Sequence, residues 1–318
     1  MNRITLGQTE LKVTPVGFGV LTIGPWQMNL PINEGAAVLR YALESGINFL
    51  DSAQYYKTYP YIKKALYGFD REVIIASKSL ASTYIGMKEA IEEARLEMNR
   101  DQIEIFMLHE VREGMDWTNR LPAWDCLQEA KAKGLIKAIG LSTHHVDVAD
   151  FAASISELDI LFPLINFRSM GIRKGSGSGT KEEMADSILK ASSAGKGIFG
   201  MKVFGGGNLT GSYQEAIRYV QRVPGIASIM IGFGHLEEID RIIEMMDGTL
   251  NTNYVPELSH KKIRIDQGDC IGCQACINRC PNHALYLDSN GIAAVDYELC
   301  ITCGYCAPQC PVMAIIMY

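Results

Sequence analysis

The feature that most constrains this 318-residue chain is a cysteine run near its C-terminus that occurs twice. The first copy reads C-x2-C-x2-C-x3-C-P, from Cys270 to Pro281, and the second repeats this spacing at an offset of 30 residues, from Cys300 to Pro311. Three closely spaced thiolates followed by a Cys-Pro pair suit the corners of an iron–sulfur cubane. The duplication therefore predicts two [4Fe–4S] clusters in one small domain.

Zinc is the alternative metal for such a group of thiols. Zinc ribbons use separated C-x2-C pairs, however, and two cysteine triplets with a trailing Cys-Pro would oversupply a single zinc ion. Eight of the nine cysteines lie in this segment, which favours metal binding over disulfides in a reducing compartment. Another alternative stays open, in which the clusters only stabilise a domain too small for its own core. The ninth cysteine, Cys126, is expected to be a buried apolar thiol.

The segment from Lys262 to Tyr318 resembles the bacterial-type ferredoxins. In two-cluster ferredoxins the fourth cysteine of each run ligates the other cluster. The resemblance implies one cluster on Cys270, Cys273, Cys276 and Cys310, and a second cluster on Cys300, Cys303, Cys306 and Cys280. We therefore divide the chain into a large domain, residues 1–250, and a linker with a small α+β ferredoxin-like domain, residues 251–318.

The large domain alternates short apolar runs with amphipathic stretches, eight of each, between Val16 and Met246. Such alternation predicts an α/β fold of the (β/α)8 TIM barrel type. Asn33 is expected to cap the first helix, and the residues Met87, Ile91, Ala94 and Met98 are expected to form the buried face of another. The predicted strands are residues 16–20, 47–51, 73–78, 103–109, 136–142, 160–166, 198–204 and 228–232.

Three of the predicted strands end in polar residues, at the end of a barrel where active sites lie. These residues are Asp51, Lys78 and His109, and Tyr56 follows Asp51 in the next loop. A charged pair of Asp51 and Lys78 would lower the pKa of the Tyr56 phenol and make it a proton donor, while His109 would orient a carbonyl group. Taken singly, each residue also fits a structural role in the core.

These residues and their neighbours resemble the aldo-keto reductase family over about Ile4 to Met246. The matching segments, in order and spacing, are Asp51-Ser-Ala-Gln-Tyr-Tyr56, Ala76-Ser-Lys78, Leu108-His109 and Ile139-Gly-Leu-Ser142. The resemblance implies hydride transfer from NADP or NAD to an aldehyde or ketone without a metal. It assigns Tyr56 as the general acid, Lys78 and Asp51 as its tuning pair, and His109 as the donor to the carbonyl.

The cofactor side matches the family less closely. Thr143 replaces the usual asparagine beside Ser142, and Met201 replaces the aromatic residue that stacks on nicotinamide. These departures leave two interpretations open, a rebuilt nicotinamide site or a different redox cofactor such as a flavin. The cofactor-binding residues implied by the resemblance are Gly19, Ser142, Thr143, Asn166, Met201, Lys202, Phe204, Gly205, Gly206, Gly232, Gly234, Glu238 and Arg241.

A hydride carries two electrons, whereas each cluster accepts one. The leading prediction is a fused oxidoreductase that acts on a small carbonyl or alcohol substrate and exchanges electrons with an external ferredoxin-like partner. One alternative is an ordinary NAD(P)H carbonyl reductase whose clusters are structural or regulatory. The other alternative is an electron carrier or redox sensor in which the barrel is a scaffold.

Composition and charge bear on the partners and the location of the protein. The net charge is −6 with acidic and basic residues interspersed, which argues against nucleic acid and anionic membranes as partners. Met1 to Val13 lacks the apolar region of a signal peptide, and no stretch of about 20 apolar residues predicts a membrane span. A cytoplasmic location is therefore expected. The glycine-rich segment Gly175–Gly179 is expected to be a mobile lid or a linker.

Overall fold

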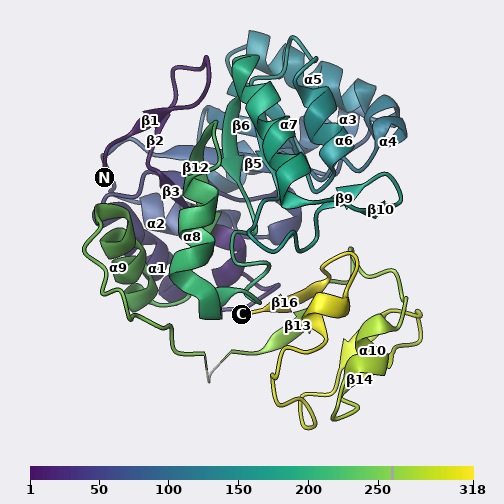
Figure 1. The fold of residues 1–318 in the computed structure, drawn as a ribbon. Coiled ribbons are helices and arrows are strands. Elements are labelled where there is room, and N and C mark those ends of the chain that lie inside the picture. The colour runs from purple at the N-terminus through teal and green to yellow at the C-terminus, as the bar shows by residue number, and fades with distance from the viewer. Residues whose placement is uncertain (259–260) are drawn as a thin grey trace.

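The computed structural model describes residues 1–258 and 261–318, and its larger part is a closed barrel of parallel strands (Figure 1). Every predicted strand overlaps one strand of this barrel, so the predicted TIM barrel is confirmed. In barrel order the strands are β11 (Gly197–Gly200), β12 (Ile226–Ile231), β3 (Val16–Gly19), β4 (Phe49–Asp51), β5 (Ile74–Ser79), β6 (Ile103–Leu108), β7 (Ile136–Thr143) and β8 (Ile160–Pro163).

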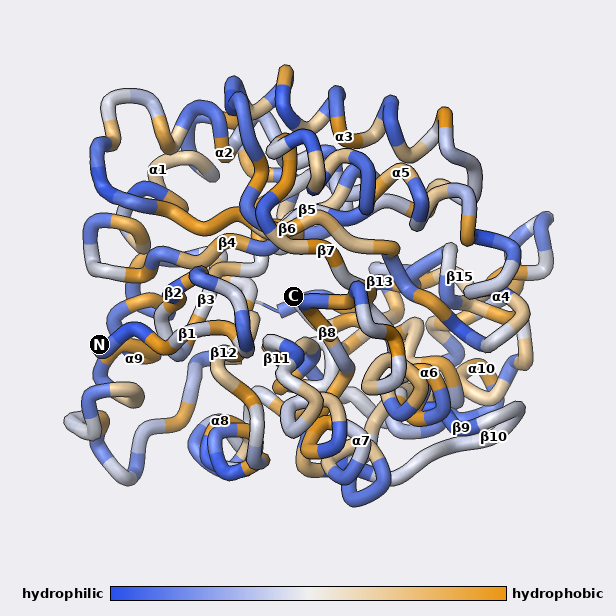
Figure 2. Tube along the Cα trace, turned by 90° about the horizontal axis from the view of Figure 1, so that it is seen from above, coloured by the Kyte–Doolittle hydropathy of each residue, from blue (hydrophilic) through white to orange (hydrophobic). Residues whose placement is uncertain are grey.

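Helices surround the barrel on its outside (Figure 2). The expected cap at Asn33 is wrong, because the first helix already begins at Ile32, directly after Pro31, whose ring fixes φ and ends the preceding loop. The predicted buried face of α3 is confirmed. The helices are α1 (Ile32–Glu44), α2 (Tyr59–Leu66), α3 (Tyr84–Met98), α4 (Gly114–Asn119), α5 (Leu121–Ala132), α6 (Val146–Ala152), α7 (Lys181–Ser193), α8 (Tyr213–Gln221) and α9 (Leu236–Asp247).

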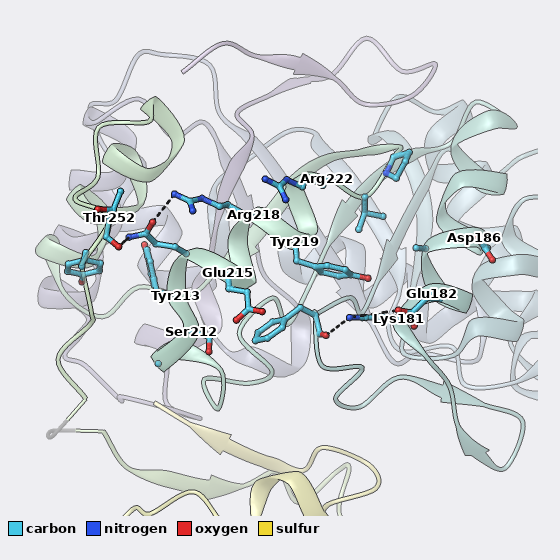
Figure 3. Close-up of a pocket in the computed structure, with 17 residues that line it drawn as sticks. Lys181, Glu182, Asp186, Ser212, Tyr213, Glu215, Arg218, Tyr219, Arg222 and Thr252 are labelled. Atoms are coloured by element: carbon cyan, nitrogen blue, oxygen red, sulfur yellow. Dashed lines mark hydrogen bonds and ion pairs between the residues drawn. The ribbon is translucent and has the colours of Figure 1, made fainter.

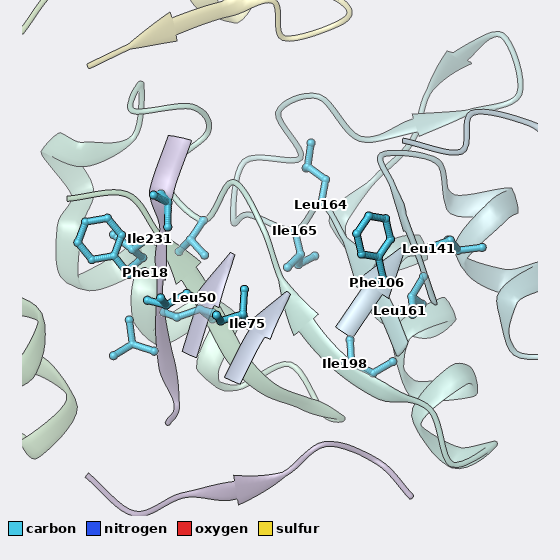
Figure 4. Packing of buried hydrophobic residues seen from close by; sticks show 14 of the residues in the cluster. Phe18, Leu50, Ile75, Phe106, Leu141, Leu161, Leu164, Ile165, Ile198 and Ile231 are labelled. Atoms are coloured by element: carbon cyan, nitrogen blue, oxygen red, sulfur yellow. The ribbon is translucent and has the colours of Figure 1, made fainter. Parts of the chain in front are cut away.

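Alternation along the strands separates two apolar layers. One layer packs between strands and helices and includes Phe18, Leu50, Ile75, Phe106, Leu141, Leu161, Ile198 and Ile231 (Figure 4). The other layer fills the barrel interior and includes Phe49, Ile74, Ala76, Ile105, Met107, Ala138, Ile160, Phe162, Phe199 and Met230. A hairpin of β1 (Ile4–Thr5) and β2 (Lys12–Val13) adds Leu6, Leu11 and Val13 to this interior layer and closes the N-terminal end of the barrel.

Two short segments complete the large domain. Strands β9 (Arg173–Lys174) and β10 (Gly177–Ser178) form a hairpin, so the segment expected to be a lid or linker is the turn and second strand of a paired structure. The Gly175 amide at its turn donates to the Asp147 carboxylate at 2.6 Å, which ties the hairpin to α6. No helix of the described residues is both long enough and apolar enough to cross a membrane.

The iron–sulfur domain is built from two short antiparallel sheets. Strand β13 (Ile263–Ile265) pairs with β16 (Ile315–Met317), and β14 (Leu285–Leu287) pairs with β15 (Ala293–Val295). A short helix follows the start of each cysteine run, α10 (Ala275–Arg279) in the first and the 3-10 helix η4 (Ala307–Gln309) in the second. The sequence duplication is therefore also a structural one.

This small domain lies against the C-terminal ends of the barrel strands, with β13 and β16 nearest the barrel (Figure 1). The Met317 amide donates to Gly206 O at 2.7 Å, and Arg264 lies over the ring of Trp26 at 5.2 Å. Met313 packs into the buried cluster of the large domain. The iron–sulfur domain thus covers the end of the barrel at which an active site is expected.

Candidate active site

Strand alternation places three of the predicted catalytic residues inside the barrel. Asp51 has the parity of the interior residue Phe49 on β4, and Lys78 has the parity of Ala76 on β5. His109 directly follows β6 and continues the interior parity of Met107. All three therefore lie at the C-terminal end of the interior, under the iron–sulfur domain.

Asp51 and Lys78 form a buried ion pair. The Lys78 ammonium donates to Asp51 Oδ1 at 2.7 Å and to Ser52 O at 2.8 Å. Lys78 is 1% exposed and Asp51 is 5% exposed. Burial raises the pKa of the Asp51 carboxyl and lowers the pKa of Lys78, whereas their mutual attraction acts the other way in each case. Each charge is thus compensated chiefly by the other.

Tyr56 joins this pair from the 3-10 helix η2 (Gln54–Tyr56), which follows β4. Its ring centroid lies 4.8 Å from Lys78 Nζ and 5.5 Å from the centroid of the His109 ring. The structure therefore brings all four predicted catalytic side chains together. Their spacing is compatible with acid–base chemistry at a single substrate oxygen.

The expected direction of the Tyr56 pKa is wrong. Burial, followed by the carboxylate of Asp51, raises the pKa of Tyr56 well above 10. Asp266 and Asp269 of the iron–sulfur domain act in the same direction. The Lys78 ammonium is paired with Asp51, and the net effect of the surroundings on the phenol is a raised pKa. The Tyr56 phenol is therefore held in its protonated form.

His109 is a neutral imidazole at this site. Burial and then the charges of Lys78 and Arg120 hold its pKa well below 6.5. Its Nδ1 atom is buried and has no hydrogen-bond partner among the described residues. A buried polar atom without a protein partner is costly unless a ligand or water satisfies it. This atom is consistent with a polar group binding beside Tyr56.

The neutral state of His109 predicts a pH effect. We expect the ratio of the wild-type rate to the His109→Gln rate to stay constant between about pH 5.5 and 8, because His109 gains no proton in that range. The ratio removes the contribution of other titrating groups, and turnover of a carbonyl substrate across the range measures it. A ratio that changes around pH 6.5 would show that the imidazole becomes charged.

Three of the predicted cofactor-binding residues form hydrogen bonds with neighbouring loops. Ser142 Oγ accepts from the Glu110 amide at 2.8 Å, and Thr143 Oγ1 donates to a backbone carbonyl at 2.6 Å. The Asn166 side chain donates to Met170 O and accepts from Met170 N, each at 2.9 Å. These polar atoms organise the loops after β6 and β8.

The glycine-rich loop after β11 contacts the iron–sulfur domain. Gly206 O accepts from Met317 N, and Asn208 Nδ2 donates to Ile315 O at 2.9 Å. A Cβ atom at position 207 would lie 1.9 Å from Met317 O. Gly205 and Gly206, expected to approach a pyrophosphate, thus belong to a loop on which strand β16 lies. Asn208 was not predicted, and its contact depends on a partner 107 residues away.

The remaining residues expected around a nucleotide are also packed within the chain. Glu238 Oε2 accepts from the amides of Gly234 and His235, which closes the N-terminus of α9. Arg241 forms an ion pair with Glu244 at 2.6 Å. Further contacts place Gly232 against Thr22, Gly19 beside Gly232, Phe204 against Tyr213, and Met201 between the two apolar layers.

Lys202 pairs with a residue that sequence reasoning missed. Its ammonium lies 3.8 Å from Asp269, and Arg112 lies 3.6 Å from the same carboxylate. Asp269 and burial together raise the pKa of Glu110 to about 7. Asp269 directly precedes Cys270, and only that position in the sequence hints at its role. It connects the first cysteine run to the barrel.

The eight C-terminal cysteines form two groups in space. Cys270, Cys273, Cys276 and Cys310 line one small cavity, and Cys280, Cys300, Cys303 and Cys306 line another. None of the eight is in a disulfide, and backbone amides donate to the sulfurs of Cys270, Cys280 and Cys310 at 3.2–3.5 Å. Each group takes three cysteines from one run and the fourth from the other. Crossed ligation of two cubanes requires this grouping.

A larger groove lies elsewhere, on the outside of the barrel between α7 and α8 (Figure 3). Its volume is about 900 Å³, and Lys181, Arg218, Tyr219 and Arg222 are among the residues that line it. Lys181 is engaged there by the Phe167 carbonyl at 2.9 Å. None of the four predicted catalytic residues lines this groove, so it is not the site described above.

Comparison with known proteins gives distant relatives of each domain. An uncharacterized oxidoreductase of Bacillus subtilis, YqkF, is 21% identical over 77% of this chain and 90% of its own length. A ferredoxin of Pyrobaculum islandicum is 43% identical over 56 residues, and the match spans about half (52%) of that ferredoxin.

Solved structures support the same architecture. An aldo-keto reductase of Bacillus halodurans, AKR11C1, superposes with a TM-score of 0.63 at 18% identity, over 79% of this chain and 92% of that one. A structure assigned to the same family, from Pseudomonas aeruginosa, gives a TM-score of 0.66 at 23% identity, over 78% and 95% of the two chains. At these identities the likeness shows the fold alone.

Family models decide the assignment. The aldo/keto reductase family model matches residues 15–224, and the 4Fe-4S dicluster domain model matches residues 263–317. The first match spans more than half of the chain and contains the four predicted catalytic residues, Asp51, Tyr56, Lys78 and His109. This protein is an oxidoreductase that belongs to the aldo/keto reductase family and carries a C-terminal 4Fe-4S dicluster ferredoxin domain.

Proposed function

We propose that this protein interconverts an aldehyde or ketone with the corresponding alcohol at the Tyr56 site and exchanges the electrons through its two clusters. The proposal rests on the position of the iron–sulfur domain, which lies against the C-terminal end of the barrel. Asp269, the residue before Cys270, forms ion pairs with Lys202 and Arg112 at the barrel end, and its charge reaches Tyr56. An iron–sulfur domain that only stabilised the fold would not need to lie at this end of the barrel.

The residues of the barrel have separate roles in this proposal. Reduction of a carbonyl to an alcohol consumes two electrons and two protons: Tyr56 supplies the proton that reaches the oxygen, and the second proton reaches the carbon from solvent. His109, as a neutral imidazole, orients the carbonyl oxygen towards Tyr56. The ion pair of Lys78 with Asp51 fixes the floor of the site. Oxidation of an alcohol uses the same residues in reverse.

The cysteine groups fit two [4Fe–4S] clusters, one on each crossed set of four thiolates. When bound, each cluster supplies or accepts one electron, so the pair matches a two-electron conversion. The cysteines of the first run and Cys310 would hold the cluster nearer the barrel, since Asp269 and Met313, which contact the barrel, lie next to them in the chain.

An external ferredoxin-like partner would need an exposed cysteine group. Ile301 is 65% exposed and Tyr305 is 57% exposed beside Cys303, which is itself exposed. Ile271 and Cys273 of the first run are exposed as well. Either cysteine group would therefore offer such a partner a surface from which to exchange electrons with the cluster it holds.

The principal alternative is an ordinary NAD(P)H carbonyl reductase with structural or regulatory clusters. The family implies a nicotinamide nucleotide, and a flavin is the other candidate for an intermediary. Ser142 and Asn166, two of the predicted cofactor-binding residues, form hydrogen bonds with neighbouring loops. The glycine-rich loop after β11 is bonded to β16. The fit is poor, which favours electron supply through the clusters.

One experiment tests the proposal. The holoprotein is purified without oxygen, any released flavin or nicotinamide is identified, and the clusters are reduced with a stoichiometric amount of dithionite. We expect a panel of aldehydes and ketones to include substrates that reoxidise the clusters, with about one alcohol formed for every two electrons. Clusters that stay reduced with every carbonyl, beside normal NADPH-dependent reduction, would support the ordinary reductase instead.

A further inference from the structure

We infer that the C-terminal strand β16 (Ile315–Met317) occupies the loop on which an aldo-keto reductase barrel would hold its nucleotide, so that the holoprotein binds neither NADPH nor NADH there. Electrons then reach the Tyr56 site through the iron–sulfur domain alone. The second statement rests on the proposed function, whereas the first does not. In this arrangement the iron–sulfur domain takes the place of the dinucleotide.

Hydrogen bonds hold the strand on both of its edges. On one edge β16 pairs with β13, and the pairing continues in the reciprocal bonds between Lys262 and Tyr318 at 2.7 and 2.9 Å. On the other edge the strand is bonded to the glycine-rich loop. Met317 N donates to Gly206 O, and Asn208 Nδ2 donates to Ile315 O. The loop thus continues the sheet, and the strand has no free edge here.

The glycines of this loop are explained by the strand. Gly206 and Gly207 both have positive φ, at 63° and 86°. A Cβ atom at 207 would overlap Met317 O at 1.9 Å, and one at 206 would lie 2.9 Å from the Ile316 side chain. Contact with β16 therefore requires glycine at 207, and the positive φ favours glycine at 206. No phosphate is needed to account for them.

Charge at the barrel end also disfavours a pyrophosphate. Lys202 and Arg112, cations near the loop ends, are both paired with Asp269. The N-terminus of α9, where a phosphate could otherwise bind, is closed by the carboxylate of Glu238. Arg241 is paired with Glu244. A dinucleotide would have to break these pairs as well as displace the strand.

Two measurements on the oxidised holoprotein test the inference. In equilibrium dialysis we expect no saturable binding of NADPH or NADH up to about 1 mM nucleotide. In hydrogen exchange followed by mass spectrometry, we expect the peptide spanning residues 313–318 to exchange equally with and without nucleotide. One nucleotide bound per chain in the micromolar range, together with faster exchange of this peptide, would overturn the inference.

A pair of variants tests the contact itself. Asn208→Ala removes the side-chain bond to Ile315 O, so the 313–318 peptide should exchange about fivefold faster while the iron content stays unchanged. Gln102→Ala is the matched control, because its amide also donates to a backbone carbonyl, that of Gly134 at 2.6 Å, but on the opposite end of the barrel. Equal exchange in the two variants would mean that the loop does not hold the strand.

The outcomes separate this inference from the proposed function. Absence of nucleotide binding together with clusters that reduce no carbonyl would leave the inference standing and remove the proposed function. Micromolar nucleotide binding together with cluster-driven turnover would remove the inference and leave the proposed function standing.

Discussion

Replacing Tyr56 with phenylalanine should lower the rate of carbonyl reduction by about 10²- to 10⁴-fold, the usual contribution of a positioned general acid. The substitution keeps the ring that lies over Lys78 and against His109, and it removes only the phenol proton. Turnover is measured with chemically reduced clusters as the electron source. Iron content and cluster absorbance should match those of the wild type.

The matched control is Tyr55→Phe. Tyr55 is the neighbouring residue, 42% exposed, and its ring stacks on Trp26 with centroids 5.4 Å apart. Phenylalanine preserves that stack, so we expect a rate within about threefold of the wild type, since surface changes of this kind are near neutral. If Tyr56→Phe kept its activity, Tyr56 would not be the general acid of this site.

Local patterns were sufficient to predict most of the fold. Each barrel strand is a short apolar run, and the interior parity of Ala76 and Met107 extends to Lys78 and His109. This periodicity is a property of consecutive residues, so sequence alone reveals it. The cysteine spacing is equally local, and the resemblance to two-cluster ferredoxins that it carries implied the grouping of thiols that the structure shows.

Contacts between distant segments could not be predicted in the same way. The glycine-rich loop has the composition of a phosphate loop, and nothing near it in sequence indicates that Ile315 and Met317 lie on it. The pKa of Tyr56 depends on Asp266 and Asp269, which come from the other domain. Pairings of this kind arise from docking, which residue periodicity does not encode.

Docking of the iron–sulfur domain has a consequence for the chemistry of the barrel. The carboxylates of Asp266 and Asp269 help to keep Tyr56 protonated, because an anionic phenolate beside them would be repelled. The same domain covers the site and limits the access of water. One contact surface thus favours the protonated state of Tyr56 and brings the cysteine groups close to it.

Breaking the ion pair under Tyr56 should destabilise the barrel. Asp51→Asn keeps an oxygen that can accept from Lys78, but it leaves the 1%-exposed ammonium without a compensating negative charge. We expect a loss of about 3–5 kcal/mol in the free energy of unfolding, the usual cost of removing one partner of a buried pair. Denaturant unfolding followed by tryptophan fluorescence measures it, since Trp26, Trp117 and Trp124 all lie in the large domain.

Two further variants show whether the cost comes from the charge. Asp150→Asn breaks an exposed pair with Lys190, 2.8 Å long, and should cost no more than about 1 kcal/mol. Adding Lys78→Met to Asp51→Asn removes the stranded ammonium, so the double variant should recover much of the lost stability. A double variant as unstable as Asp51→Asn would show that side-chain shape, and not an uncompensated charge, makes this position sensitive. In that case the pair would be a packing element of the barrel floor, and Tyr56 would owe its position to the packing.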